Sequence, residues 1–441
     1  MAIAAAGNAL YGELLGRIGD ARRRSDELFA IVQPDALYER PIPERHRIIF
    51  YIGHLEAFDW NLLHGALPAL KSFHPEFDRL FAFGIDPVNG GLPSDQPSDW
   101  PRLEFVREYV GKIRGALDEM LEECSFDRPR DGFPFHTLLH VAIEHRLMHV
   151  ETLAYMLHQL PFDRKIPHNA PRDPFSSHAT PAMVGIPSGV ATLGLPRGSS
   201  FFGWDNEFEA HKVHVEAFEI DRYKVTNREY LEFLNAGGYG SRELWSAEDW
   251  QWKSDKQISH PVFWEKLGEM WLYRGMFEEI PLPQDWPVYV SHAEAAAFAR
   301  WAGKSLPTEE EWQRAAYGTT DGRESPYPWG SGAPGPEFGN FNLQRWNPAP
   351  VNAFPRSATA FGAQDILGNG WEWTSTQFAP FPGFKPFPFY KGYSADFFDG
   401  KHFVMKGASS RTAGCMLRPS FRNWFQPHYQ YVYAGFRCVK R

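Results

Sequence analysis

Apolar residues in the first 162 residues of the chain recur at intervals of three and four. This spacing is found in four segments, residues 9–21, 47–67, 103–123 and 135–160. A period near 3.6 places such residues on one face of an α-helix, which must then be buried against other helices. The pattern predicts an all-α four-helix bundle. The stretch FGIDPVNGGLPSDQPSDWP, rich in Gly, Pro and Asp, predicts a long loop between the second and third helices.

The pattern changes after residues 167–181, which are rich in Pro, Ser and Asn and are typical of a linker. Beyond them, short apolar runs such as KVHVEAFEIDRYKV predict short strands between large loops. The expected architecture is therefore multidomain. A helical bundle over residues 1–166 is followed by an α+β domain over residues 182–441.

Three helices are predicted inside the second domain, over residues 226–238, 291–304 and 307–318. Thr226 or Asn227 has the side chain that an N-terminal cap of the first helix requires. Thr308 is followed three residues later by Glu311, which is the spacing of a capping box.

Composition narrows the classes of partner and compartment. The net charge of −9 argues against a nucleic-acid partner, which would require a basic patch. No run of roughly 18 apolar residues predicts a membrane span, and the first residues do not resemble a secretion signal. Three cysteines, Cys124, Cys415 and Cys438, are too few for a disulfide framework and favour a reducing cytoplasm. A Cys415–Cys438 bridge or redox pair stays open.

The most specific local signal is a histidine pair, His145 and His149, in the fourth predicted helix. Residues four apart lie on one helix face, so their imidazoles can bind one metal ion. Imidazole suits iron, zinc, copper and nickel alike. His136 and His140 have the same spacing on nearly the opposite face, so periodicity does not decide which pair faces the core. His54, in the second predicted helix, is either a hydrogen-bonded core residue or a third ligand.

Residues 182–441 carry an ordered series of motifs that resembles the formylglycine-generating-enzyme and sulfatase-modifying family, which has a C-type-lectin-like fold. The motifs are IPSGVATLG (186–194), HKVHVEAFEIDRYKVTNREYLEFL (211–234), WPVYVSHAEAAAFARWAGKSLPTEEEWQRAAYG (286–318), YPWG (327–330), LGNGWEWT (367–374) and AGFRC (434–438). The N-terminal helices resemble the DinB-like domain. Together the two resemble the hercynine oxygenases, which are ergothioneine-type sulfoxide synthases, and the related selenoneine synthases.

The resemblance implies a non-haem Fe(II) enzyme that uses O2. Its reaction would join a thiol or selenol donor to the imidazole carbon of hercynine. The family binds iron with a histidine on an early helix and the two histidines of an HxxxHxE motif. These positions correspond to His54, His145 and His149, and Glu151 completes the motif.

The resemblance also implies roles for residues of the second domain. The family's catalytic acid is the first tyrosine of a YxxYS segment, which here is Tyr390 in YKGYS, and a phenol can donate a proton to reacting atoms. Tyr393, in the same segment, is expected to contact substrate. In RPSFRNW, residues 418–424, Asn423 and Trp424 would bind hercynine. An aromatic face such as that of Trp424 suits its trimethylammonium group.

Three features depart from the family pattern around the donor. Phe425 stands where many relatives have Asp, Met148 stands where relatives often have Gln, and the loop over residues 83–93 has no Arg or Tyr. We include Phe425 and Met148 among the substrate-binding residues. Because these positions offer few charged partners, we expect that the donor is not γ-glutamylcysteine. Free cysteine and a neutral selenosugar are the two alternatives.

Three other functions are compatible with parts of the sequence. Formylglycine generation would need a reactive pair such as Cys415 and Cys438. A DinB-type metal-dependent thiol transferase would use the histidines without the second domain's chemistry. A lectin-like binding module would not be an enzyme. The bound metal distinguishes them: iron indicates the oxygenase, copper the formylglycine enzyme, zinc the transferase, and no metal the binding module.

Overall fold

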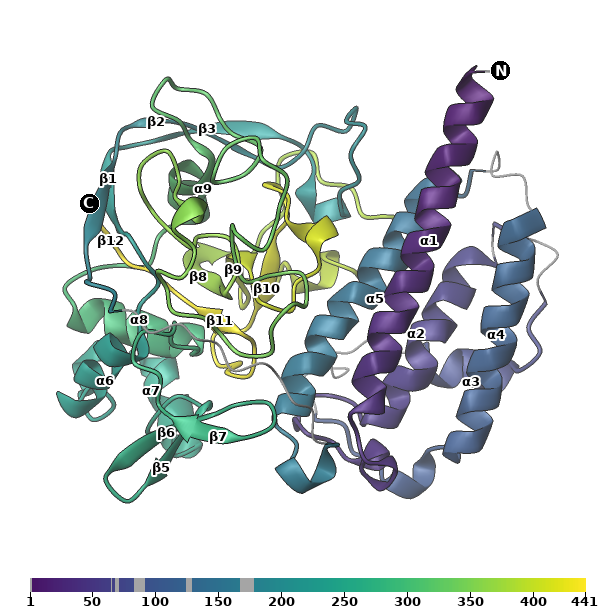
Figure 1. Cartoon of the computed structure of the whole chain (residues 1–441), viewed down its shortest axis with the longest axis horizontal. Coiled ribbons are helices and arrows are strands. Elements are labelled where there is room, and N and C mark those ends of the chain that lie inside the picture. The colour runs from purple at the N-terminus through teal and green to yellow at the C-terminus, as the bar shows by residue number, and fades with distance from the viewer. Residues whose placement is uncertain (1, 65, 68–70, 83–91, 124–128, 167–177) are drawn as a thin grey trace. The chain divides into compact units, whose positions relative to one another are not determined.

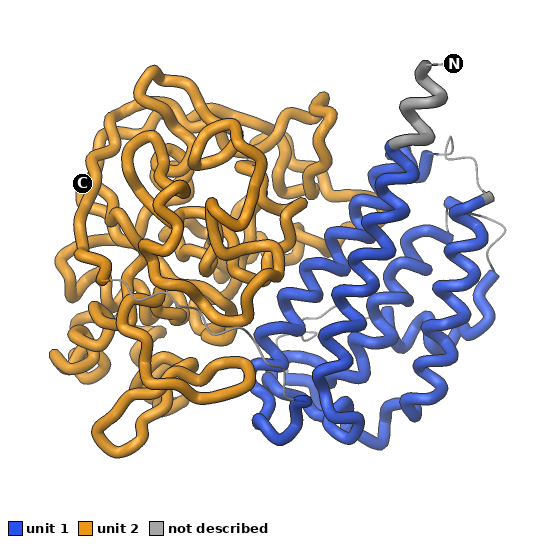
Figure 2. The backbone as a smooth tube through the Cα atoms, viewed as in Figure 1, with its two compact units in different colours: residues 1–168 blue, residues 169–441 orange. Residues whose placement is uncertain are grey.

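The computed structural model describes residues 2–64, 66–67, 71–82, 92–123, 129–166 and 178–441. The chain divides into two compact units, Met1–His168 and Asn169–Arg441 (Figure 2). The first is helical, and the second combines short strands with helices, which confirms the predicted fold class. Most of the loop at residues 83–93, Cys124 and most of the predicted linker lie outside the described residues.

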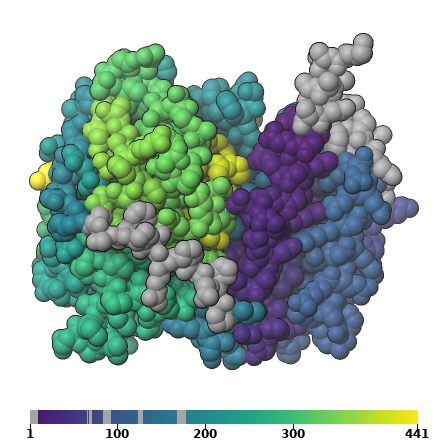
Figure 3. Space-filling model, in the orientation of Figure 1, coloured from purple at the N-terminus to yellow at the C-terminus, as the bar shows by residue number. Residues whose placement is uncertain are grey.

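Four long helices build the first unit (Figure 1). They are α1 (Ala2–Ala30), α2 (Ile48–Leu63), α4 (Leu103–Glu123) and α5 (Phe135–His158). Helix α1 packs on α5, and α2 packs on both α4 and α5. Helices α1 and α4 lie side by side on one face (Figure 3), where Arg22 donates to Asp118 at 2.6 Å. The short helix α3 (Pro75–Leu80) was not predicted, because six residues are too few to show a helical period.

A buried network of charged side chains ties the bundle helices together. Arg146 of α5 donates to Glu56 Oε1 at 2.9 Å and to Asp59 Oδ2 at 2.6 Å, both on α2. Arg114 of α4 donates to the same Glu56 oxygen at 2.7 Å, and Arg146 also donates to Ser25 Oγ of α1 at 3.3 Å. Loss of one partner would leave an uncompensated buried charge, so the network fixes the helices relative to one another.

The described part of the second unit contains four small sheets. The first has the order β1 (Met183–Ile186), β4 (Phe218–Asp221), β12 (Val439–Lys440), and the second has the order β10 (Asn423–Phe425), β9 (Phe403–Ala408), β8 (Gly370–Gln377), β11 (Ala434–Gly435). Strands β2 (Gly189–Leu193) and β3 (His211–Val215) form a pair, and β5 (Trp264–Leu267), β6 (Met270–Arg274) and β7 (Glu279–Pro281) form a meander. Strand β10 is an edge strand paired antiparallel with β9, which places Trp424 opposite Val404.

Two of the four helices in the described part of the second unit begin at predicted caps. They are α6 (Asn227–Asn235), α7 (Ala247–Asp255), α8 (His292–Trp301) and α9 (Glu309–Tyr317). Thr226, not Asn227, is the N-cap of α6, and its hydroxyl accepts from Glu229 N at 3.3 Å. Thr308 and Glu311 form the predicted capping box of α9. Helix α7, capped by Ser246, was not predicted.

The structure also bears on two questions raised by the composition, a membrane span and a Cys415–Cys438 bridge. Within the described residues, no helix is both long and apolar enough to cross a membrane. Cys415 and Cys438 are free thiols, so no bridge joins them. Cys438 is buried, and burial raises the pKa of its thiol well above the usual value. Because the thiolate is the reactive form, such a thiol is a poor nucleophile.

Candidate functional site

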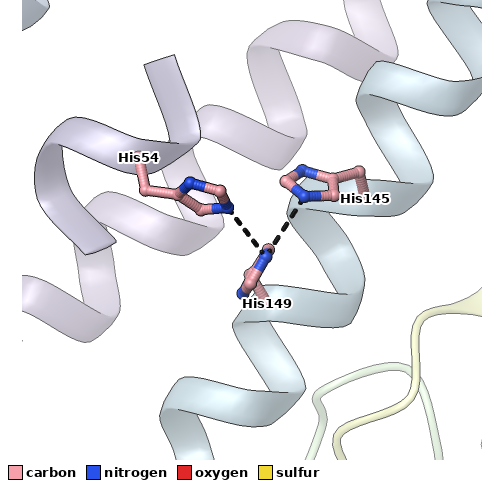
Figure 4. Close-up of side chains that lie close together, drawn as sticks. All are labelled: His54, His145 and His149. Atoms are coloured by element: carbon pink, nitrogen blue, oxygen red, sulfur yellow. Dashed lines mark hydrogen bonds between the residues drawn. The ribbon is translucent and has the colours of Figure 1, made fainter. Parts of the chain in front are cut away.

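Three histidines from two helices converge in the first unit (Figure 4). His54 lies in the middle of α2, and His145 and His149 lie one turn apart on α5. His149 Nε2 is 3.3 Å from His54 Nε2 and 3.2 Å from His145 Nε2. One ring nitrogen of each residue lies within 4.8 Å of the other two, and all three side chains are buried. The structure thus brings the three predicted ligands together.

Neighbouring groups orient the rings. His54 Nδ1 donates to the carbonyl oxygen of Phe81 at 2.7 Å. Because a carbonyl only accepts, Nδ1 of the neutral ring carries the proton, and Nε2 keeps the lone pair that faces His149. The His145 ring stacks on Phe58, with the ring centroids 3.4 Å apart. Phe81 is the C-cap residue of α3, so the helix that the sequence pattern missed supplies one of the orienting contacts.

Burial keeps the three imidazoles neutral. It lowers the pKa of His54 to about 4 and the pKa values of His145 and His149 well below the usual value. The charge of Arg146 acts in the same direction at all three rings. Neutral imidazole is the form that binds metals. Three convergent neutral nitrogen donors therefore fit a divalent metal, and iron, zinc, copper and nickel all accept such a set.

The other histidine pair of α5 lies apart from this cluster. His136 and His140 are half-buried, and their ring centroids are 6.5 Å apart. Among the described residues, no second group of three His, Cys, Asp or Glu side chains converges in this way. Met148 is half-buried one position before His149, and Glu151 is buried two positions after it.

Aromatic contacts bring three of the predicted residues of the second unit together, Tyr390, Tyr393 and Trp424. The rings of Tyr390 and Tyr393 are 5.6 Å apart, and those of Tyr393 and Trp424 are 5.5 Å apart. Trp204 stacks on Tyr393 at 3.9 Å and approaches Tyr390 edge-on at 6.3 Å. Trp424 in turn stacks on Phe378 at 4.2 Å, nearly parallel. Sequence reasoning missed Trp204 and Phe378, since no spacing relates them to residues 390–424.

The two faces of β10 differ in what they contact. Successive side chains of a strand point to opposite faces, so Asn423 and Phe425 share one face and Trp424 lies on the other. Phe425 stacks on Tyr429 at 5.0 Å. Asn423 Oδ1 accepts from Trp424 N at 2.9 Å. Thus Trp424 belongs to the aromatic cluster with Tyr390 and Tyr393, whereas Phe425 packs on a different aromatic side chain.

Comparison with known proteins matches both units to families. The DinB superfamily matches residues 17–153, and the sulfatase-modifying factor enzyme 1-like domain matches residues 170–441. The chain is 36% identical over 401 residues to a hercynine oxygenase of Mycolicibacterium smegmatis, covering 88% of this chain and 89% of that protein. The chain belongs to the hercynine oxygenase family.

Two other relatives differ from each other in length and similarity. A hercynine oxygenase of Mycolicibacterium thermoresistibile is 36% identical over 97% of this chain and 94% of its own length. Ergothioneine biosynthesis protein 1 of Neurospora crassa is 30% identical over 92% of this chain, which matches 55% of that protein. In this hercynine oxygenase family member, the DinB-like unit contains the three convergent histidines. The predicted resemblance is confirmed over nearly the whole chain.

Proposed function

We propose that this chain is an Fe(II)- and O2-dependent enzyme that forms a C–S or C–Se bond at the imidazole carbon of hercynine. The observation that carries the proposal is the convergence of the His54, His145 and His149 Nε2 atoms within the DinB-like unit. Family membership supports the substrate, because curated relatives are named for hercynine and ergothioneine. In this proposal, residues 1–166 hold the metal and residues 182–441 supply the side chains that act on substrate.

The histidines hold the metal through neutral nitrogens that need no deprotonation. Phe81 fixes the His54 tautomer, and Phe58 fixes the plane of the His145 ring. Bound Fe(II) would supply the redox chemistry of O2 and would activate the sulfur or selenium of the donor. We propose a cytoplasmic location, since the two free thiols fit a reducing compartment.

Tyr390 donates a proton from its phenolic oxygen while the new bond to the imidazole carbon forms. Its segment is held in the aromatic cluster with Tyr393 and Trp204, which supports a fixed position for the phenolic oxygen of Tyr390. A general acid contributes only when it lies within hydrogen-bond reach of the group that it protonates. A fixed segment is therefore what this role requires.

In this proposal, Asn423, Trp424 and Tyr393 bind hercynine. An amide can hydrogen-bond a carboxylate or a ring nitrogen, and aromatic faces attract a trimethylammonium group. Trp424 and Tyr393 lie in the same aromatic cluster, and aromatic faces suit a quaternary cation. This arrangement supports recognition of the quaternary nitrogen that distinguishes hercynine from histidine.

The donor is a small thiol or a neutral selenosugar rather than γ-glutamylcysteine. Phe425 and Met148 carry no charge, and both are half-buried. Burying the charged groups of a γ-glutamyl donor against such side chains costs several kcal/mol unless other residues pair with them. If the selenosugar is preferred, the chain is a selenoneine synthase in the strict sense.

The test is a product assay with the iron-loaded full chain. Protein is reconstituted anaerobically with Fe(II), exposed to air with hercynine, and given γ-glutamylcysteine, cysteine or a selenosugar. Mass spectrometry identifies the adduct, and kcat/KM ranks the donors. Cysteine or the selenosugar should exceed γ-glutamylcysteine by at least about tenfold, the cost of one lost charge-assisted contact. A preference for γ-glutamylcysteine would refute the donor proposal, and transfer without O2 by zinc-loaded protein would favour a thiol transferase.

A further inference from the structure

A short buried turn, residues 204–207, touches both substrate-side segments of the second unit. We call it the acidic turn, after its residues Trp204, Asp205, Asn206 and Glu207. All four side chains are buried. The turn is closed by Glu207 Oε1, which accepts from Trp204 N at 2.8 Å. It lies far in sequence from residues 387–394 and 418–424, so contacts between them reflect the folded structure.

Asp205 contacts both ends of the segment that carries Tyr390, residues 387–394. Ser394 Oγ donates to Asp205 Oδ1 at 2.6 Å, and Phe387 N donates to Asp205 Oδ2 at 3.4 Å. Between these points the backbone turns tightly, as Tyr390 N donates to Phe387 O at 3.1 Å and Tyr393 N donates to Tyr390 O at 3.3 Å. One carboxylate therefore closes the loop in which the proposed acid lies.

The indole of Trp204 supports the same segment from one side. It stacks on Tyr393 with the centroids 3.9 Å apart and meets Tyr390 at 6.3 Å and Phe387 at 6.4 Å. Contacts to three aromatic residues of one short segment restrict its side chains as well as its backbone.

Glu207 holds the other segment, which leads into β10. Arg418 Nε donates to Glu207 Oε2 at 2.8 Å, while its Nη2 donates to Oε1, giving a bidentate ion pair. Ser420 Oγ donates to Glu207 Oε2 at 2.6 Å. Asn423 and Trp424 follow within three to four residues of Ser420, so this contact sets where β10 begins.

We propose that the acidic turn positions Tyr390 relative to Asn423 and Trp424, with Asp205 holding residues 387–394 and Glu207 holding residues 418–424. The inference rests on the proposed function and adds positioning residues to it. Asp205 and Glu207 are two residues apart in one closed turn, so the two segments cannot shift independently while both contacts last. A general acid misplaced by about 1 Å can lower the rate a hundredfold, so loss of the contacts of the acidic turn should lower turnover.

Hydrogen exchange tests the structural half of the inference without any assay of activity. In Asp205→Ala and in Ser394→Ala, the amides of residues 387–394 should exchange at least about tenfold faster than in the parent chain. The control is Glu294→Gln, a buried carboxylate that caps α8 and accepts from Tyr239 at 2.6 Å. It should leave exchange over residues 387–394 unchanged. Parent-like exchange in folded Asp205→Ala would overturn the inference.

Kinetics of the iron-loaded protein test the functional half. Asp205→Ala should lower kcat about 10- to 100-fold with little change in KM for hercynine, because it releases the proposed acid. Glu207→Gln should mainly raise KM for hercynine, because it releases the segment before Asn423 and Trp424. Equal loss in both parameters for both variants indicates general damage and overturns the inference.

A double-mutant cycle separates failure of the inference from failure of the proposed function. If Asp205 acts through Tyr390, Asp205→Ala should add little to the loss caused by Tyr390→Phe. Additive losses would overturn the positioning role. Full kcat in Tyr390→Phe would instead refute the acid role proposed above. Hydrogen exchange over residues 387–394 would then decide by itself whether the acidic turn positions this segment.

Discussion

The two units hold their candidate functional residues by different physical means. In the first, one helical turn separates His145 from His149, and a buried ion network joins their helix to the one that carries His54. In the second, the aromatic cluster draws on segments around residues 204, 378, 390–397 and 424, most of them outside regular structure. Regular helices fix the proposed metal ligands, and specific long-range contacts fix the side chains proposed to bind substrate.

The difference bears on how each part tolerates change. A shift of α5 moves His145 and His149 together, so the proposed metal site depends on the few strong contacts that join α5 to α2. Loop segments on a scaffold accept substitution more readily and carry specificity in many folds.

The largest effect is expected at the metal ligands. Replacing His54, His145 or His149 by Ala should remove most of the iron and abolish turnover, because each supplies one of three converging nitrogens. Metal content by mass spectrometry checks this. His136→Ala and His140→Ala are matched controls on the same helix and should retain iron. Loss of iron in those two variants alone would place the site on the other face of α5.

Next in size is the effect of removing the proposed acid. Tyr390→Phe should lower kcat by about 10²- to 10⁴-fold, the usual contribution of a general acid. Iron content should stay unchanged, because the ligands lie in the other unit. Tyr317→Phe, which removes a buried phenol in α9, should retain turnover. An iron-loaded Tyr390→Phe protein with normal kcat would remove Tyr390 from the mechanism.

A stability measurement probes the ion network beside the proposed metal site. Arg146→Met should destabilise the protein by about 3–5 kcal/mol, because it leaves the buried Asp59 without this cationic partner and leaves Glu56 with Arg114 alone. Arg24→Met, which breaks a partly exposed pair with Asp20, should cost about 1 kcal/mol or less. Denaturant unfolding of the two variants gives the comparison. Equal small losses would mean that helix packing alone places His54 against α5.

The smallest effect is expected at the aromatic cluster. Trp424→Leu should weaken hercynine binding roughly three- to thirtyfold, the range of one cation–π contact. Binding of histidine, which lacks the trimethylammonium group, should change less. Calorimetry with both ligands provides the test. Parallel losses for hercynine and histidine would assign Trp424 a packing role.

The fold of the first unit could be predicted because helical periods are local. The same periodicity did not decide which of the two histidine pairs of α5 faces the core. The contact of Phe81 with His54 could not be predicted, because α3 is too short to show a helical pattern. Capping predicted the starts of α6 and α9 for the same local reason. By contrast, Asp205 and Trp204 meet residues 387–394 across about 180 residues of sequence. No period or spacing reports such a contact, and only the resemblance to a family drew attention to Tyr390.

The most direct test of the central claim is an iron titration of the apo protein. Fe(II) is added anaerobically in steps, and the hercynine adduct formed after admission of O2 is measured at each step. If His54, His145 and His149 hold one catalytic iron, product should rise linearly and level off at one iron per chain, and His145→Ala should form no product at any iron level. Product formation that does not depend on iron, or that continues in His145→Ala, would contradict it.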